Sequence, residues 1–484
     1  MDGNVDNHWL EENIHHGFEF FEPMGDTLLE DGQMAIPDHS EEWYHDRGHH
    51  ELLQTRRCMS GVLESLLPFM MWSIGLSVVQ RMIWRTDMYV YFLYREHLRD
   101  CLVSALGLFL LWSNASIYQP YAFVIYFWIS FSALFLLNRS PNKGHYVSAV
   151  TFVYVVLTQI YFEDVQFTAF RGSLMIVSMK MISLAYDTKE ISMMEMPSIM
   201  AYLFNPSTLL FGPFNTIEQY RHAKRRCQKF CIKSFLLHFV TCLKYLAFAI
   251  LFVTYSSCIV DQIPTFFNEP KLGHYTTAQA FRSSQYFVGY FSLFTALIGG
   301  FGENDVHTTH WTSVEWPRSL TEVVVHWNLP MHGFLHKYIY QKTRLNFGHF
   351  PAMLSTFLAS SLLHGFNFQL TAVLLSLGFY AYVESSLRKH LASKLSACVE
   401  SRNCDPQCAH RHRKWSFLSV TVNLVFVFLN IFHLAYLGAP FQQIEAQRYG
   451  YSWKHTLSVW EKDWQYSSHI LSIILLFLSI ILSF

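Results

Sequence analysis

The sequence has few charged residues for its length. Only 15% of its 484 residues are Asp, Glu, Lys or Arg, whereas soluble domains carry about 25%. The formal net charge is −1, so no excess of positive charge indicates a nucleic-acid partner. Hydrophobic residues make up 51% of the chain and aromatic residues 17%, and aromatic side chains concentrate at membrane interfaces. This composition predicts an integral membrane protein rather than several soluble domains.

Two other signals are missing. The nine cysteines are scattered singly along the chain, which does not predict a disulfide framework. No basic segment followed by an apolar core opens the sequence, so we predict no cleavable signal peptide. Residues 1–57 instead hold 14 acidic and three basic residues, a composition typical of a disordered tail. The predicted domains are this acidic tail, 1–57, and a membrane domain, 58–484.

Long apolar runs recur after the tail, and they predict an all-helical polytopic bundle of about 11 transmembrane elements. The run at 350–387 is too long for one span. As a straight helix it would reach roughly 57 Å, against about 30 Å of hydrocarbon. It must turn, and Gly365 and Asn367 mark the place, with His364 beside them. Irregular backbone at membrane depth needs protein or a water-filled cavity around it, so this turn predicts a central cavity or tunnel.

Basic loops predict the orientation, because Lys and Arg collect in cytosolic loops. Loops 139–145, 214–233 and 388–415 are all rich in basic residues, and we predict that all three are cytosolic. Three apolar runs separate the first two loops, so strict alternation fails and one run must be re-entrant. We predict that this is 172–186, because it is short and carries Lys180, and a charge within an apolar run is rarely neutral.

Two short motifs carry a family resemblance. Residues 327–331 read WNLPM, and residues 360–366 read SSLLHGF, with the His close to a Gly inside a hydrophobic run. This pair resembles the membrane-bound O-acyltransferase family, and the likeness covers roughly residues 60–484. Shorter stretches that support it are 171–173 (RGS), 175–177 (MIV), 211–213 (FGP), 318–324 (RSLTEVV) and 431–438 (IFHLAYLG).

The flanking stretches narrow the resemblance to the members that modify a serine of Wnt proteins. It implies palmitoleoyl-CoA as acyl donor, a Wnt serine as acceptor, and a multi-pass location in the endoplasmic reticulum membrane. No cofactor is expected beyond this co-substrate, and membrane lipids are the other expected partners. Two alternatives stay open: another acceptor of the same family, such as a lysolipid, sterol or other peptide, and a membrane transporter, in which intramembrane polar residues also occur.

The resemblance implies that His364 and Asn328 are catalytic. A neutral imidazole can take the proton from an attacking hydroxyl, which is a weak nucleophile at neutral pH. The amide of Asn328 could orient a substrate or stabilise an oxyanion, although Asn also favours helix caps and turns. A lone His on an apolar face is more often a core residue, but the forced turn and the motif favour catalysis here.

Further residues are predicted to contact the substrates. Those beside the catalytic pair are Trp327, Pro330, Met331, His332, Ser360, Gly365 and Phe368. The aromatic residues Phe366, Phe368, Phe379 and Tyr380 are expected walls of a bent tunnel that selects a cis-monounsaturated chain. Arg171 and Lys180 are predicted to meet donor phosphates, with interfacial snorkelling as the alternative. Arg318 and Glu322 are spaced to pair on a helix surface.

The remaining candidates involve cysteine. Cys227 and Cys231 lie in a basic stretch beside an apolar run, a setting typical of S-palmitoylation. Cys398, Cys404 and Cys408 with His410 and His412 have the residue types of a metal site. Their spacing, C-x5-C-x3-C-x-H-x-H, departs from the C-x2–4-C pairs of zinc sites. On spacing alone, no metal site is predicted.

Overall fold

The computed structural model describes residues 41–85, 92–113, 119–162, 164–227, 232–263, 273–365, 367–405, 407–441 and 453–483. The elements named in these ranges are helices, as predicted. They are α2 (Glu41–Arg85), α3 (Phe92–Ser113), α4 (Gln119–Leu136), α5 (Lys143–Tyr161), α6 (Asp164–Asp187), α7 (Met196–Leu203), α8 (Ile217–Cys227), α9 (Ile232–Thr254), α11 (Gly273–Ile298), α12 (Trp311–Glu315), α13 (Leu320–Trp327), α14 (Leu329–Leu335), α15 (Gln341–Phe347), α16 (His349–Leu363), α17 (Phe368–Leu395), α18 (Phe417–Gly438), α20 (Trp453–Lys462) and α21 (Ser467–Ser483).

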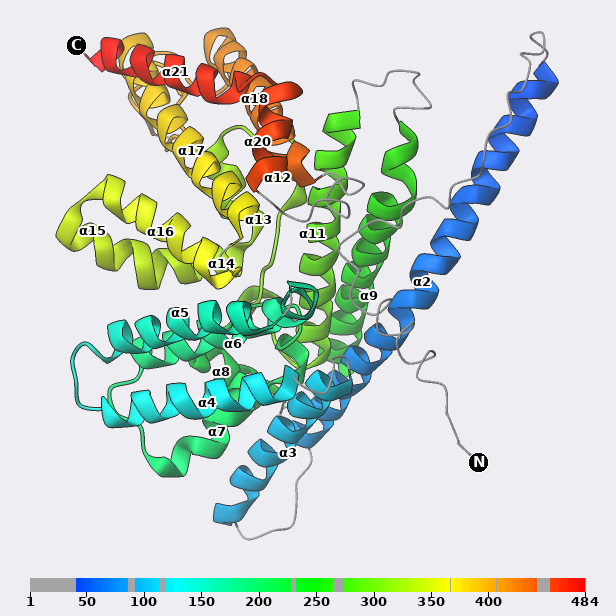
Figure 1. Cartoon of the computed structure of the whole chain (residues 1–484), viewed down its shortest axis with the longest axis vertical. Coiled ribbons are helices and arrows are strands. Elements are labelled where there is room, and N and C mark those ends of the chain that lie inside the picture. Colours follow the sequence, from blue (N-terminus) through cyan, green and yellow to red (C-terminus); the bar gives the residue numbers. More distant parts are fainter. Residues whose placement is uncertain are drawn as a thin grey trace.

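The helices form packed groups around α11. Helices α9 and α11 lie side by side, with α2 beside them and α18 also against α11 (Figure 1). Helices α4, α5 and α6 form a second group, and α15, α16 and α17 form a third. The two groups meet where α16 packs on α5. Within the described ranges, five helices are long and apolar enough to cross a membrane, or six if the bent pair α20–α21 is one span. The protein is therefore multi-pass, while the predicted count of about 11 elements stays a prediction.

The predicted boundary of the acidic tail falls inside helix α2, which begins at Glu41. The part of α2 that is apolar enough to cross a membrane begins at Leu53, close to the predicted division after residue 57. The first 40 residues lie outside the described residues. The division into tail and membrane domain stays a prediction.

The predicted re-entrant segment was wrong. Residues 172–186 belong to α6, a continuous helix of 24 residues. The broken segment is 197–213, where α7 ends after eight residues and Pro206 begins a 3-10 turn. Glu195, before this segment, pairs with Arg221, after it, at 3.3 Å. The chain therefore enters and returns on one face, and protein buries residues 201–209, as irregular backbone at membrane depth requires.

Lys180 lies on α6, but its hydrogen-bond partners lie in the re-entrant segment, so its charge did not mark the segment that is re-entrant. Its Nζ donates to the carbonyl oxygen of Tyr202 at 3.0 Å and to Oγ1 of Thr208 at 2.8 Å. Burying an ammonium group is costly unless such partners surround it. Lys180 therefore fastens 197–213 to α6.

Contacts between loops support the predicted orientation. Lys143 Nζ donates to the carbonyl oxygen of Lys189 at 2.6 Å, and Asn138 exchanges two hydrogen bonds with Ile191. Together with the Glu195–Arg221 pair, these contacts place loop 139–145 and helix α8 on one face, as their basic residues predict.

The opposite face carries a disulfide. Cys58 on α2 is bonded to Cys258, which follows α9. Arg85, the last residue of α2, is 27 positions beyond Cys58, roughly 40 Å along a helix. Trp84, next to it, packs on Tyr220 of α8, at the face with the basic loops. Since disulfides persist in oxidising compartments, the two faces have the chemistry expected of a non-cytosolic and a cytosolic side.

Candidate active site

The predicted turn in the 350–387 run is present. Helix α16 ends at Leu363, His364 is its C-cap, and α17 begins at Phe368. Gly365 has φ = +81°, and a Cβ there would lie 2.5 Å from the ring of Phe167. Both the backbone angle and the close approach require glycine. Oδ1 of Asn367 accepts a hydrogen bond from the backbone N–H of Leu370 at 3.3 Å and caps α17. The turn is thereby satisfied without the imidazole of His364.

A cavity of about 940 Å³ lies beside this turn, near the upper end of the range usual for small-molecule sites. It brings together residues from α6, from the α13–α14 junction and from the α16–α17 hairpin. The predicted site residues that line it are Arg171, Trp327, Asn328, Pro330, Met331, His332, Ser360 and His364. Both proposed catalytic residues therefore face one space, although they are 36 positions apart in the chain.

Asn328 performs the helix-capping role that was its alternative interpretation. It is the N-cap of α14, and its Oδ1 accepts from the backbone N–H of Met331 at 3.0 Å. The cap engages the amide oxygen, so the group that remains for a ligand is the Nδ2 donor. A donor suits stabilisation of an oxyanion. Capping and catalysis are thus compatible at Asn328, because they use different atoms.

Several predicted contacts do not line the cavity: Lys180, Gly365, Phe368, Phe379 and Tyr380. Phe366, another predicted wall, lies outside the described residues. Lys180 is held in the re-entrant segment, and Gly365 is required by the turn. Phe368 begins α17 with 43% of its surface exposed, so it faces away from the cavity.

Helix α17 is apolar on several sides, so its cavity-facing side could not be read from the sequence. The side that it presents is formed by Leu374, Leu377, Gly378, Ala381 and Ser385. Phe357 of α16 also lines the cavity, and it packs on Gly378, where a Cβ would lie 2.6 Å from its ring. Tyr380, a predicted wall, is instead buried against the ring of His433. Phe357 and this stripe of α17 therefore form one apolar wall of the cavity.

The cavity has a basic end that the sequence analysis did not identify. Arg344 of α15, Lys389 of α17 and Arg402 of the following loop line it. Lys337, one turn before α15, pairs with Asp187 at 2.8 Å, next to the loop that contacts Lys143. This end therefore lies toward the face with the basic loops, which we predict to be cytosolic. The available signal was that Lys389 and Arg402 belong to the basic segment 388–415, which the positive charge of its loop already predicts to be cytosolic.

Arg171 occupies the other half of the cavity. It precedes Asp187 by 16 positions, roughly 24 Å along α6. Phe167, one turn earlier on α6, lies against the turn at Gly365. Arg171 is thus near the turn rather than at the basic end.

Cys227 is poorly placed for modification. Its side chain is buried, and its thiol lies 3.7 Å from the carbonyl oxygen of Gly300. Burial raises the pKa of the Cys227 thiol, which lowers the thiolate fraction that reacts. Cys231, the other predicted acylation site, lies outside the described residues.

A profile of the membrane-bound O-acyltransferase family matches residues 104–396. Among curated proteins, the chain is 34% identical over 425 residues to the protein-serine O-palmitoleoyltransferase porcupine of Mus musculus, covering 79% of this chain and 88% of that protein. The Homo sapiens protein of the same name is 34% identical over 426 residues, covering 81% and 89%. That of Drosophila melanogaster is 35% identical over 303 residues, covering 55% and 56%. The chain belongs to the membrane-bound O-acyltransferase family.

Membership in this O-acyltransferase family decides between the classes left open by the sequence. A buried His, an amide donor and an apolar wall in one cavity serve acyl transfer, whereas a transporter would need no general base. The matched range contains α14, α16 and α17, and it includes both His364 and Asn328.

Proposed function

We propose that the protein transfers a palmitoleoyl group from palmitoleoyl-CoA to a serine hydroxyl of a Wnt protein in the endoplasmic reticulum membrane. The observation that carries the proposal is the single cavity that joins His364 and Asn328 to an apolar wall and a basic end. The names of the relatives, which include protein-serine O-palmitoleoyltransferase, support the choice of donor and acceptor.

The donor would bind with its phosphates at Arg344, Lys389 and Arg402, because guanidinium and ammonium groups pair well with phosphate oxygens. This replaces the predicted phosphate site at Arg171 and Lys180. The acyl chain would lie along Phe357 and the Leu374–Leu377 side of α17. Each buried CH₂ contributes about 0.8 kcal/mol, so an apolar wall of this kind favours a long chain.

His364 would act as general base. It takes the proton from the serine hydroxyl, and the oxygen attacks the thioester carbonyl carbon. Nδ2 of Asn328 donates a hydrogen bond to the oxyanion that forms. The C–S bond then breaks, the ester remains on serine, and the CoA sulfur receives the proton from His364. No acyl-enzyme intermediate is required, because one cavity holds both substrates.

The test is label transfer by the detergent-purified protein. Alkyne-tagged palmitoleoyl-CoA is mixed with a disulfide-bonded Wnt hairpin peptide, a peptide in which the serine is replaced by alanine, a lysolipid and a sterol. We expect label on the serine peptide alone. Label on the lysolipid or sterol instead of the peptide would reassign the acceptor, and equal label on both peptides would exclude serine as the nucleophile.

A further inference from the structure

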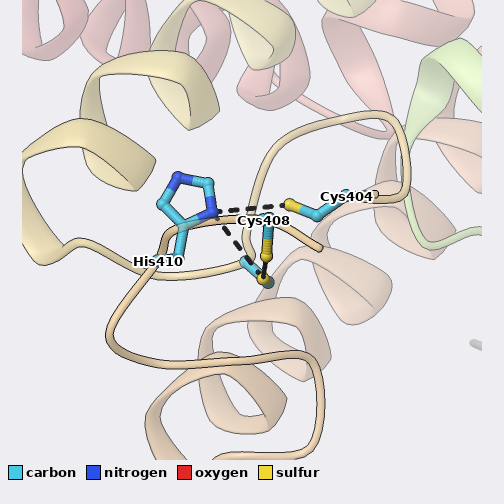
Figure 2. A group of neighbouring side chains, drawn as sticks. Cys404, Cys408 and His410 are labelled. Carbon is cyan, nitrogen blue, oxygen red and sulfur yellow. Dashed lines mark hydrogen bonds between the residues drawn. The ribbon is translucent and has the colours of Figure 1, made fainter. Parts of the chain in front are cut away.

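A second cluster of reactive side chains lies outside the cavity, in the loop between α17 and α18. Its members are the thiols of Cys398, Cys404 and Cys408 and the imidazole of His410. Figure 2 shows Cys404, Cys408 and His410 turned toward one another. One ligand atom from each lies within 4.8 Å of all the others. None of these residues takes part in the proposed acyl transfer.

The distances suit one metal ion. Nδ1 of His410 lies 3.7 Å from Sγ of Cys398 and 3.7 Å from Sγ of Cys404. A tetrahedron with Zn–S bonds of about 2.3 Å has ligand atoms roughly 3.8 Å apart. The thiols of Cys398 and Cys408 are 3.2 Å apart, well beyond the roughly 2.05 Å of a disulfide bond.

The fold explains how these side chains meet although their spacing departs from the C-x2–4-C pairs of zinc sites. The backbone N–H of Cys398 donates to the carbonyl oxygen of His412, and the backbone N–H of His412 donates to the carbonyl oxygen of Ser396, both at 2.9 Å. These two bonds clamp the ends of the loop together. A turn follows at Asp405, whose Oδ1 accepts from the backbone N–H of Gln407 at 2.9 Å. Ligands separated by five, three and one intervening residues therefore converge without a C-x2–4-C pair.

The charge and compartment of the loop favour a metal over a disulfide. The loop joins the cavity's basic end, and residues 388–415 carry an excess of Lys and Arg, as cytosolic loops do. Cytosolic thiols stay reduced and commonly bind metal. Three thiolates and one imidazole nitrogen are soft ligands that select zinc over calcium or magnesium.

We propose that Cys398, Cys404, Cys408 and Nδ1 of His410 form a structural zinc site. Four protein ligands close the coordination sphere, as structural sites require, and leave no position for a catalytic water. Binding converts three thiols to thiolates and releases their protons. The zinc ion with three thiolates carries a net charge of −1, in a loop where Arg402, Arg411 and Arg413 supply positive charge.

The site would hold the edge of the active-site cavity. Between the first two ligands, residues Glu400, Ser401 and Arg402 line the cavity. Arg318 Nη2 donates to the carbonyl oxygen of Glu400 at 2.8 Å, and Ser319 Oγ donates to that of Ser401 at 2.9 Å. Ser319 caps α13, which leads directly to Asn328. The metal thus fixes the segment that places Arg402 at the basic end.

The primary test is the metal content of the full-length protein, purified without a polyhistidine tag, by inductively coupled plasma mass spectrometry. We expect about one zinc per chain in the wild type and loss of that zinc in Cys404→Ser and Cys398→Ser. Cys101→Ser, a free and exposed cysteine on α3, and His412→Ala, in the same loop but outside the cluster, should retain it. Zinc absent from the wild type, or retained by both ligand variants, would overturn the proposal.

A second measurement covers variants that fail to fold. Wild-type protein stripped with a chelator and reloaded with Co²⁺ should show the absorption bands of tetrahedral thiolate coordination. Their absence, or a Cys398–Cys408 disulfide found by mass spectrometry, would exclude the site. Neither test involves a substrate, so the outcome of each is independent of the proposed function. If that function also holds, metal loss should raise KM for acyl-CoA about tenfold and leave kcat nearly unchanged.

Discussion

Helix α17 has a polar junction at each end, and the two junctions use their side chains in opposite ways. At its N-terminal end, residues 364–367 make a turn whose backbone is satisfied by the cap at Asn367. The imidazole of His364 is left to face the cavity. At its C-terminal end, the 396–416 loop folds on itself, and its cysteines and His410 face one another.

The comparison shows that the neighbouring side chains determine whether a polar residue has a structural or a catalytic role. A His near membrane depth that has no structural role can serve a substrate, and His364 is such a residue. A His whose ring nitrogen already contacts thiols is occupied by them, and His410 is such a residue. The residue type is the same in the two places, but the neighbours supplied by the sequence and the fold differ.

The largest effect is expected at the N-terminal junction. Replacing His364 by Gln should lower kcat for acyl transfer roughly 10²–10⁴-fold, because the general base is removed, while acyl-CoA binding persists. His390→Gln is the matched control, since it changes a His of the neighbouring helix α17 that does not line the cavity. Kinetics and acyl-CoA binding measure both variants, and an active His364→Gln enzyme would contradict the assignment of the base.

The next effect separates the two uses of Asn328. Asp caps helices as well as Asn does, but it cannot donate from the position of Nδ2. Asn328→Asp should therefore keep the thermal stability of the wild type and lose roughly 10²–10³ in kcat. Asn328→Ala should lose both activity and stability. A fully active Asn328→Asp protein would mean that Asn328 is only a cap.

A stability effect is expected where the N-terminal junction requires glycine. Gly365→Ala places a Cβ 2.5 Å from Phe167 at φ = +81°, which should cost about 1–3 kcal/mol in folding free energy. Gly75→Ala is the control, because nothing lies within 4 Å of a Cβ there and Ala favours helix. Thermal unfolding compares the two, and an unchanged Tm for Gly365→Ala would show that the turn can relax.

The smallest effect concerns acyl selectivity. Phe357→Ala enlarges the apolar wall, so it should reduce the preference for palmitoleoyl-CoA over stearoyl-CoA about tenfold, as pocket differences of this size do. Phe368→Ala changes an aromatic residue outside the cavity and should leave the preference unchanged. Competition between the two donors on one peptide measures the ratio, and the reverse pattern would restore Phe368 as the wall.

The N-terminal junction was predictable because simple physical limits determine it. An apolar run longer than the membrane thickness must turn, and Gly365 and Asn367 mark where it does. The WNLPM and SSLLHGF motifs then supplied Asn328 and His364. These inferences needed only helix length, hydrocarbon thickness and local sequence.

The other features depend on contacts between distant residues. The partners of Lys180 are a backbone carbonyl and a hydroxyl more than 20 positions away, so sequence could not show that Lys180 is satisfied. Helix α17 is apolar around much of its surface, so its rotation toward Leu377 rather than Phe368 depends on packing. The thiol cluster depends on the pairing of Cys398 with His412, which spacing rules do not register.

The central claim is that one cavity holds the acyl thioester between His364 and Asn328, with the nucleotide at the cytosolic end. Cryo-electron microscopy of the protein with a non-hydrolysable thioether analogue of palmitoleoyl-CoA tests it directly. We predict that the nucleotide phosphates lie on Arg344, Lys389 and Arg402, the thioether lies beside His364, and the acyl chain lies along Phe357 and Leu377. Phosphates bound near Arg171, or an acyl chain outside this cavity, would contradict the account.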